Sequence, residues 1–176
     1  PGESDAAVIR LREQNEKNKN KVFSGVAASV DCNSRWVSLD PLRGTIASVA
    51  ESARNVSCVG AEPLAITNNL NFSSPETDIG YWQLSSSCDG ISEACKVLET
   101  PVTGGNVSLY NESKNKDNEI TPINPTPVIG MVGKIDNVEK AISSEWKNIN
   151  DQIWLIGSHK SETTIAASSY LEYFHG

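Results

Sequence analysis

A single apolar stripe between residues 40 and 60 constrains the fold more than any other feature of this 176-residue sequence. Asp40 and Pro41 favour the N-cap and first turn of a helix, and Gly60 is typical of the position just after a helix. The residues of the stripe recur every three or four positions: Ile46, Val49, Ala50, Ala53, Val56 and Val59. This spacing predicts a helix of about four turns with one buried face. The chain must therefore supply a second layer to cover that face.

A second stripe predicts another long helix. Its members step by four, three, four and three residues: Leu84, Cys88, Ile91, Cys95 and Leu98. Gly90 lies inside this pattern and weakens the helix without breaking it.

Runs rich in β-branched residues flank the two helices and predict strands. These runs are VFSGVAASVDCN, RWVSLDP, EPLAITNNLNF, PVTGGNVSLYNE, PVIGMVGKI and DQIWLIGSH. The polar, proline-containing stretch NESKNKDNEITPINPT is typical of a surface loop, and the last residues predict the start of a further helix. The sequence therefore predicts an α/β (α+β) fold, in which two long helices cover one face of a mixed, mainly antiparallel sheet.

Charge and composition exclude several classes of function. The net charge of −7 argues against nucleic acid or an anionic membrane surface as the main partner. No apolar run reaches the length of a membrane span. The four cysteines have no C-x-x-C spacing, so we expect reduced core thiols in a cytosolic protein, not a zinc site or disulfides. With only two histidines and no P-loop or Rossmann glycine pattern, a nucleotide would need another binding device.

The stretch TGGN, residues 103–106, is a candidate for that device. Glycine lets the backbone approach phosphate oxygens closely, and the side-chain oxygen of Asn106 is a neutral ligand suited to Mg²⁺. A bulged strand with asparagine in a turn explains the same residues. The polar stretch TNNLN, residues 67–71, is similarly open, because asparagines after a strand form either local turns or a polar wall.

Four longer motifs carry a resemblance to a known family. VDCNSRWVSLDPLRG, SVAESARNVSCVGAEPLAITNNLNF, PVTGGNVSLYNE and PTPVIGMVG resemble consecutive signatures of phosphoribosylformylglycinamidine synthase, from about Gly2 to Gly157. The resemblance implies that residues 1–157 form the second A domain of the synthetase subunit, which is similar to the N-terminal domain of aminoimidazole ribonucleotide synthetase. It also implies that residues 158–176 begin the following B domain. In this family, paired A domains form a barrel-like dimeric core, so the chain would supply half of it.

The resemblance further implies an ATP- and Mg²⁺-dependent ligase of purine biosynthesis in the cytoplasm. Its substrate is formylglycinamide ribonucleotide, and a glutaminase domain or subunit delivers the ammonia. By position, Asn68 and Gly105 would bind ATP, Asn106 would bind Mg²⁺ and Ser108 would bind the substrate. Asn68 replaces a usual aspartate, which puts direct metal or ribose contact there in doubt.

Two further expectations concern the chain as a unit. It begins at Pro1 and ends without a clear domain stop, so we interpret it as part of a longer protein, inactive on its own and without a catalytic residue of its own. Removal of the remaining domains would expose apolar strand edges, which predicts homodimerisation. The alternatives are a structural or auxiliary nucleotide-binding module, or a related synthetase or thiamine-monophosphate kinase.

Overall fold

The computed structural model describes residues 4–12, 22–157 and 165–175. These residues form two compact units, which are divided between Ser144 and Glu145 and are described separately.

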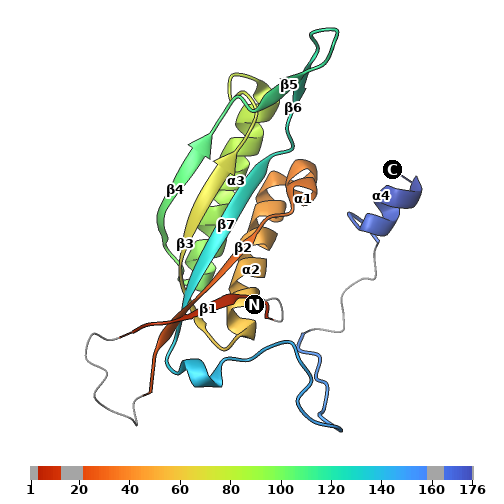
Figure 1. The fold of residues 1–176 in the computed structure, drawn as a ribbon. Helices are drawn as coiled ribbons and strands as arrows, with labels where there is room; N and C mark the ends of the chain where they lie inside the picture. The colour runs from red at the N-terminus through yellow and green to blue at the C-terminus, as the bar shows by residue number, and fades with distance from the viewer. Residues whose placement is uncertain (1–3, 13–21, 158–164, 176) are drawn as a thin grey trace. The chain divides into compact units, whose positions relative to one another are not determined.

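The first unit consists of a five-stranded sheet, three helices, a short hairpin and a 3₁₀ turn (Figure 1). The strands of the sheet are β1 (Ala7–Arg10), β2 (Gly25–Asp31), β3 (Glu62–Asn71), β4 (Val102–Ser108) and β7 (Thr126–Ile135). The helices are α1 (Ser34–Leu39), α2 (Pro41–Cys58) and α3 (Asp78–Leu98), the hairpin strands are β5 (Glu112–Lys114) and β6 (Ile120–Pro122), and the 3₁₀ turn is η1 (Val138–Lys140).

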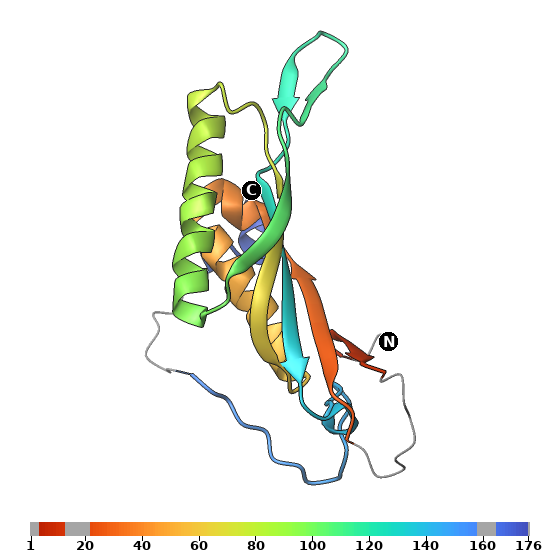
Figure 2. The same cartoon turned by 90° about the vertical axis from the view of Figure 1, so that its left-hand side faces the viewer.

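The strand order in the sheet is β1-β2-β7-β3-β4. Only the β3–β4 pair is parallel, and α3 connects these two strands. Both long helices lie against the same face of the sheet, as Figure 2 shows from the side. The predicted fold class, a mixed and mainly antiparallel sheet with one face covered by two long helices, is confirmed.

The two long helices begin and end as their sequences indicate. The Asp40 carboxylate accepts a hydrogen bond from the Arg43 backbone N–H at 3.0 Å, and the Thr77 hydroxyl oxygen accepts one from the Gly80 N–H at 3.1 Å. Gly60 has a φ of +87°, as expected for a residue that follows a helix end. The apolar faces of these helices and the covered face of the sheet form one core, which includes Val49, Val56, Ile66, Phe72, Ile91, Ile129 and Met131.

The segment RWVSLDP, predicted as a strand, is helical instead. The side chain of Asn33 accepts a hydrogen bond from the Trp36 backbone N–H at 3.2 Å and caps α1, while Val37 is fully buried. One buried apolar residue within six fits either periodicity, so pattern alone cannot separate a short strand from a short helix.

The stretch NESKNKDNEITPINPT contains the hairpin β5–β6, where a surface loop was predicted. The side-chain oxygen of Asn115 accepts hydrogen bonds from the backbone N–H groups of Asp117 and Glu119, both at 2.9 Å. These bonds order the turn, and the hairpin extends beyond the end of the sheet (Figures 1 and 2). The residues are exposed, as the sequence predicted.

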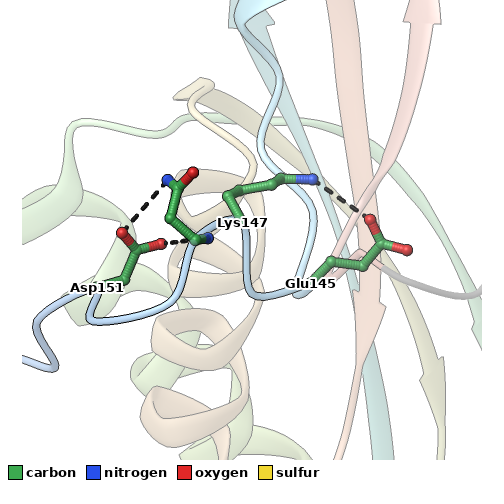
Figure 3. Close-up of polar contacts among 4 residues, drawn as sticks. Glu145, Lys147 and Asp151 are labelled. Atoms are coloured by element: carbon green, nitrogen blue, oxygen red, sulfur yellow. Dashed lines mark hydrogen bonds and ion pairs between the residues drawn. The ribbon is translucent and has the colours of Figure 1, made fainter.

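In the second unit, the described residues contain one helix, α4 (Ser169–His175), which agrees with the expected helical start. Figure 3 shows contacts near the start of the second unit, where Lys147 pairs with Glu145 at 3.3 Å and Asp151 accepts hydrogen bonds from Asn148. The strand predicted from DQIWLIGSH is absent over its described part, residues 151–157, whereas residues 158 and 159 lie outside the described residues. Here Ile153, Trp154, Leu155 and Ile156 are about 80% exposed or more, so no described residue of the second unit pairs with this apolar run or covers it. A search of the described residues found no helix long and apolar enough to span a membrane.

Candidate functional site

The parallel pair β3–β4 brings the four predicted site residues together at one edge of the sheet. In its register, Asn68 lies opposite Gly105, Asn69 opposite Asn106, and Asn71 opposite Ser108. Because β4 is the outermost strand of the sheet, one side of its backbone has no neighbouring strand. Polar side chains that are 37 residues apart in sequence thus become neighbours.

Asn106 lies on the face of the sheet that no described helix of the first unit covers. Its amide nitrogen donates to the side-chain oxygen of Asn69 at 3.1 Å, so its own side-chain oxygen is directed away from that bond. Both residues line a shallow hollow of about 450 Å³ on the open face, together with Val30, Thr67, Asn68, Gly105, Val128 and Gly130. Among the described residues, nothing donates to the Asn106 oxygen, which leaves it available to a cation or a donor.

Asn68 directs its side chain to the opposite, helix-covered face, because successive residues of a strand alternate between the two sides. A methyl group at Gly105 would overlap the Asn68 side-chain oxygen and would lie 2.8 Å from the Asn68 backbone oxygen. Asn68 also borders a groove of about 610 Å³ between α3 and β4, lined by Cys88, Ile91, Ser92, Cys95, Lys96, Glu99, Pro101 and Val102. The close approach of Asn68 therefore explains why residue 105 is a glycine.

No such contact explains the glycine at position 104. A Cβ atom built on it meets no other atom within 4 Å. The Thr67 hydroxyl donates to the Gly104 backbone oxygen at 3.1 Å, which fixes the strand but leaves the space above the glycine empty. A backbone segment that is open in this way can approach a ligand closely.

Ser108 lies at the end of β4 and is held by Asn111. The Ser108 hydroxyl is 3.2 Å from the Asn111 side-chain oxygen, and the Asn111 amide nitrogen donates to the backbone oxygens of Ser108 at 2.8 Å and Phe72 at 3.1 Å. Ser108 is half-buried and is not among the residues that line the two hollows above.

Ionisable groups contribute little to this edge of the sheet. Within the described ranges, no three His, Cys, Asp or Glu side chains gather in a way that could hold a metal ion. Burial raises the pKa of the Cys88 and Cys95 thiols beside the groove, so both stay protonated at neutral pH. Cys95 is buried as its stripe predicts, but Cys88 is exposed. The Tyr110 hydroxyl donates to Glu76 at 3.1 Å, and this bond to the carboxylate raises the pKa of Tyr110.

Sequence reasoning grouped Asn68 with Asn106 but missed that they face opposite sides of the sheet. It included Asn69 only as part of a polar stretch and did not single out Asn111. The register of β3 against β4, which no local pattern reveals, is what pairs Asn69 with Asn106. For Asn111, the available signal was an asparagine just after a strand, a residue type that often bonds to nearby backbone.

Comparisons with known proteins identify relatives of this chain. The chain is 94% identical over all 176 residues to the phosphoribosylformylglycinamidine synthase subunit PurL of Prochlorococcus marinus strain MIT 9312, and it covers 23% of that protein. It is 37% identical to Thermotoga maritima PurL in a structure complexed with ATP, with a TM-score of 0.66 over 80% of this chain and 21% of that one. A structure of the same protein complexed with FGAR gives 33% identity and a TM-score of 0.60, over the same shares of the two chains.

The chain thus spans about a quarter of the length of these relatives. Residues 3–135 match the family described as AIR synthase related protein, N-terminal domain. This match covers β1 to β7, the whole of the five-stranded sheet and both long helices. The chain belongs to the AIR synthase related protein family and comprises its N-terminal domain.

Proposed function

We propose that the chain is part of a cytoplasmic phosphoribosylformylglycinamidine synthase and forms one wall of its Mg-ATP and substrate site. The reaction joins ammonia, released from glutamine by a glutaminase, to formylglycinamide ribonucleotide, with conversion of ATP to ADP and phosphate. We expect the chain to be inactive alone, because the described residues contain no cluster of three His, Cys, Asp or Glu side chains that could hold a metal ion. The remaining domains of the synthetase supply these groups.

The observation that carries this proposal is the exposed oxygen of Asn106 on the open face of an edge strand. Its nitrogen donates to the side-chain oxygen of Asn69, and its own oxygen faces outward. Mg²⁺ prefers oxygen ligands and binds proteins through few of them, and ATP phosphates and water complete its coordination. Asn106 therefore fits as one neutral ligand of a magnesium ion that carries a nucleotide, although it cannot hold the ion by itself.

The other three residues have roles consistent with their positions. Gly105 leaves room for the Asn68 side chain, and the adjacent Gly104 leaves open space for phosphate groups. In this proposal the nucleotide lies beside Asn68 and Gly105, and Ser108 contacts formylglycinamide ribonucleotide two residues beyond Asn106. This arrangement supplies positioning and charge neutralisation, which account for most of the protein's part in phosphoryl transfer.

One observation favours an auxiliary site without turnover as the second candidate. Asn68 and Asn106 are both neutral, so these two side chains contribute no negative charge to bind the metal. The same fold with such a site would hold a nucleotide that is not consumed.

The Asn106→Ala substitution in the full-length subunit distinguishes the two candidates. If Asn106 holds the catalytic magnesium, turnover falls at least about tenfold, the effect of one lost charge-assisted contact, and the Mg²⁺ concentration needed for half-maximal rate rises. Asn115→Ala, in the turn of the hairpin, is the matched control and leaves both quantities unchanged. Unchanged turnover of the Asn106 variant, with bound nucleotide lost, would establish the auxiliary role instead.

The open sheet face indicates the partner of this domain. It carries exposed apolar side chains on three strands, Ile9 at 63%, Val30 at 71% and Val132 at 37% exposure. Such a face requires cover in water. We infer that a second A domain covers it in the full-length protein and that a second copy replaces that domain when the chain is alone. Sedimentation equilibrium at tens of micromolar tests this, since a monomer would contradict it.

A further inference from the structure

The amide group of Asn111 has only one orientation that its surroundings allow. Its nitrogen lies 2.8 Å from the Ser108 backbone oxygen and 3.1 Å from the Phe72 backbone oxygen. Backbone oxygens only accept hydrogen bonds, so the two hydrogens of Nδ2 point toward them. The reverse orientation would place the side-chain oxygen against two other oxygens.

This orientation determines where the Ser108 hydroxyl hydrogen points. The hydroxyl oxygen is 3.2 Å from Asn111 Oδ1, and it accepts a hydrogen bond at 3.1 Å from Asn111 Nδ2, whose two hydrogens are shared among this oxygen and the two backbone oxygens. The Ser108 O–H therefore donates to Asn111 Oδ1. A hydroxyl has one hydrogen and two acceptor positions, so one acceptor position of Ser108 remains for a ligand.

The segment that carries Asn111 is held on several sides. The Asn111 backbone N–H also donates to the Phe72 oxygen at 3.1 Å, and its backbone oxygen accepts from Ile123 at 3.1 Å. Glu112, the next residue, accepts a hydrogen bond from the Ser74 backbone N–H at 3.1 Å. Asn111 is thus fixed independently of Ser108, so it can orient that hydroxyl.

Asn71, the register partner of Ser108, repeats the arrangement. Both hydrogens of its amide nitrogen are used within the chain, by the backbone oxygens of Asn69 at 3.0 Å and Thr126 at 3.3 Å. No donor among the described residues reaches its side-chain oxygen. The end of the β3–β4 pair consequently presents two neighbouring acceptors, Asn71 Oδ1 and Ser108 Oγ.

We propose that Asn111 is a positioning residue that makes Ser108 a hydrogen-bond acceptor, so that Ser108 and Asn71 bind a donor group of the substrate and not its phosphate. A phosphate dianion has only acceptor oxygens and would face two further acceptors here. Ribose hydroxyls and amide N–H groups are donors of the required kind. The inference rests on the proposed substrate role of Ser108 and specifies which part of the substrate that residue contacts.

The test compares the substrate, formylglycinamide ribonucleotide, with the ribonucleoside that lacks its phosphate, in the full-length subunit. Ser108→Ala should raise the KM of the ribonucleotide and the inhibition constant of the ribonucleoside by the same factor, about tenfold for one lost hydrogen bond. The KM of ATP should not change. A loss seen with the ribonucleotide alone would overturn the proposal, because it would place Ser108 at the phosphate.

The Asn111→Ala variant and the double variant test the positioning role. Asn111→Ala should raise the substrate KM nearly as much as Ser108→Ala, and in the Ser108→Ala background it should add no further increase. If Asn111 were only structural, Asn111→Ala would lower thermal stability and raise the substrate KM by the same factor with and without Ser108→Ala. That additive result would overturn the positioning role of Asn111. Asn115→Ala is the control for an asparagine that orders local backbone elsewhere. If Asn111→Ala does not fold, the effects of Ser108→Ala on the ribonucleotide and on the ribonucleoside still decide whether Ser108 binds a donor group of the substrate.

The outcomes also separate this inference from the proposed function. If Ser108→Ala leaves the KM of the ribonucleotide unchanged, both the substrate role of Ser108 and the acceptor role fall. If Ser108→Ala affects the ribonucleotide but not the ribonucleoside, the proposed function stands and only the inference fails.

Discussion

Alanine should destabilise the protein at Gly105 but have little effect at the adjacent Gly104 of β4. At Gly105, the added methyl group would lie 2.8 Å from the Asn68 backbone oxygen and 2.9 Å from its side-chain Cγ, closer than real Cβ contacts allow. At Gly104, it would meet no atom within 4 Å. The two variants differ by one position in the same edge strand, so each serves as the control for the other.

The expected magnitude follows from these contacts. The Asn68 side chain can rotate away, but its backbone oxygen is fixed by the sheet, so part of the overlap at position 105 remains. Overpacking of this kind costs about 1–3 kcal/mol. For a unit of about this size, that corresponds to a melting temperature lower by about 2–10 °C. Gly104→Ala should change the free energy of unfolding by less than about 0.5 kcal/mol, because alanine also restricts the unfolded chain.

Urea denaturation of the 176-residue chain, followed by circular dichroism, measures both variants. Asn68→Ala combined with Gly105→Ala should recover only the part of the loss that the side chain causes. Equal destabilisation at the two glycines would refute the reasoning, because the cause would then be the backbone entropy of the strand and not the close approach of Asn68.

Two further predictions concern the half-buried Cys32 thiol, which follows β2, and the buried Thr45 hydroxyl in α2. Burial raises the pKa of the Cys32 thiol to about 11, so at pH 8 only about 0.1% is thiolate. Alkylation mapped by mass spectrometry should be fast at exposed Cys58 and slow at Cys32, and the Cys32 rate should still rise above pH 10. Comparable alkylation rates of the two thiols at pH 8 would contradict the burial of Cys32. The Thr45 hydroxyl is fully buried and has no hydrogen-bond partner within the described part of the chain. Thr45→Val should therefore raise the free energy of unfolding by about 1 kcal/mol, seen as a higher urea midpoint, and a lower midpoint would reveal a partner for that hydroxyl.

The sequence predicts the long helices well because their signals are local and redundant. Asp40 and Gly60 mark the ends of α2, and six apolar residues mark its face. The same reasoning fails for residues 35–41, where one buried valine cannot establish a period. It also fails for residues 151–157, where an apolar run is typical of a strand, but a strand requires a partner to pair with.

Some features of the candidate site can likewise be predicted from the sequence, whereas others cannot. Residue types alone make Asn106 a candidate cation ligand and allow close backbone approach at the glycines, while a bulged strand explains the same residues. They do not reveal which glycine is required by the fold and which is not, since that depends on the position of Asn68 across the strand pair. The orientation of Ser108 by Asn111 depends on the corner that follows β4, where Tyr110 has a φ of 59°, and no pattern of apolar residues encodes that corner.

The opposite orientations of Asn68 and Asn106 limit the shape of any molecule that touches both. A compact ligand resting on one surface of the sheet reaches only one of the two amides. To reach both, a ligand must bend around the rim formed by β4, with its two ends on different sides of a single polypeptide backbone. A nucleoside triphosphate is long enough for this, whereas inorganic phosphate is not, so a free phosphate ion should respond to substitution of one asparagine and be insensitive to substitution of the other.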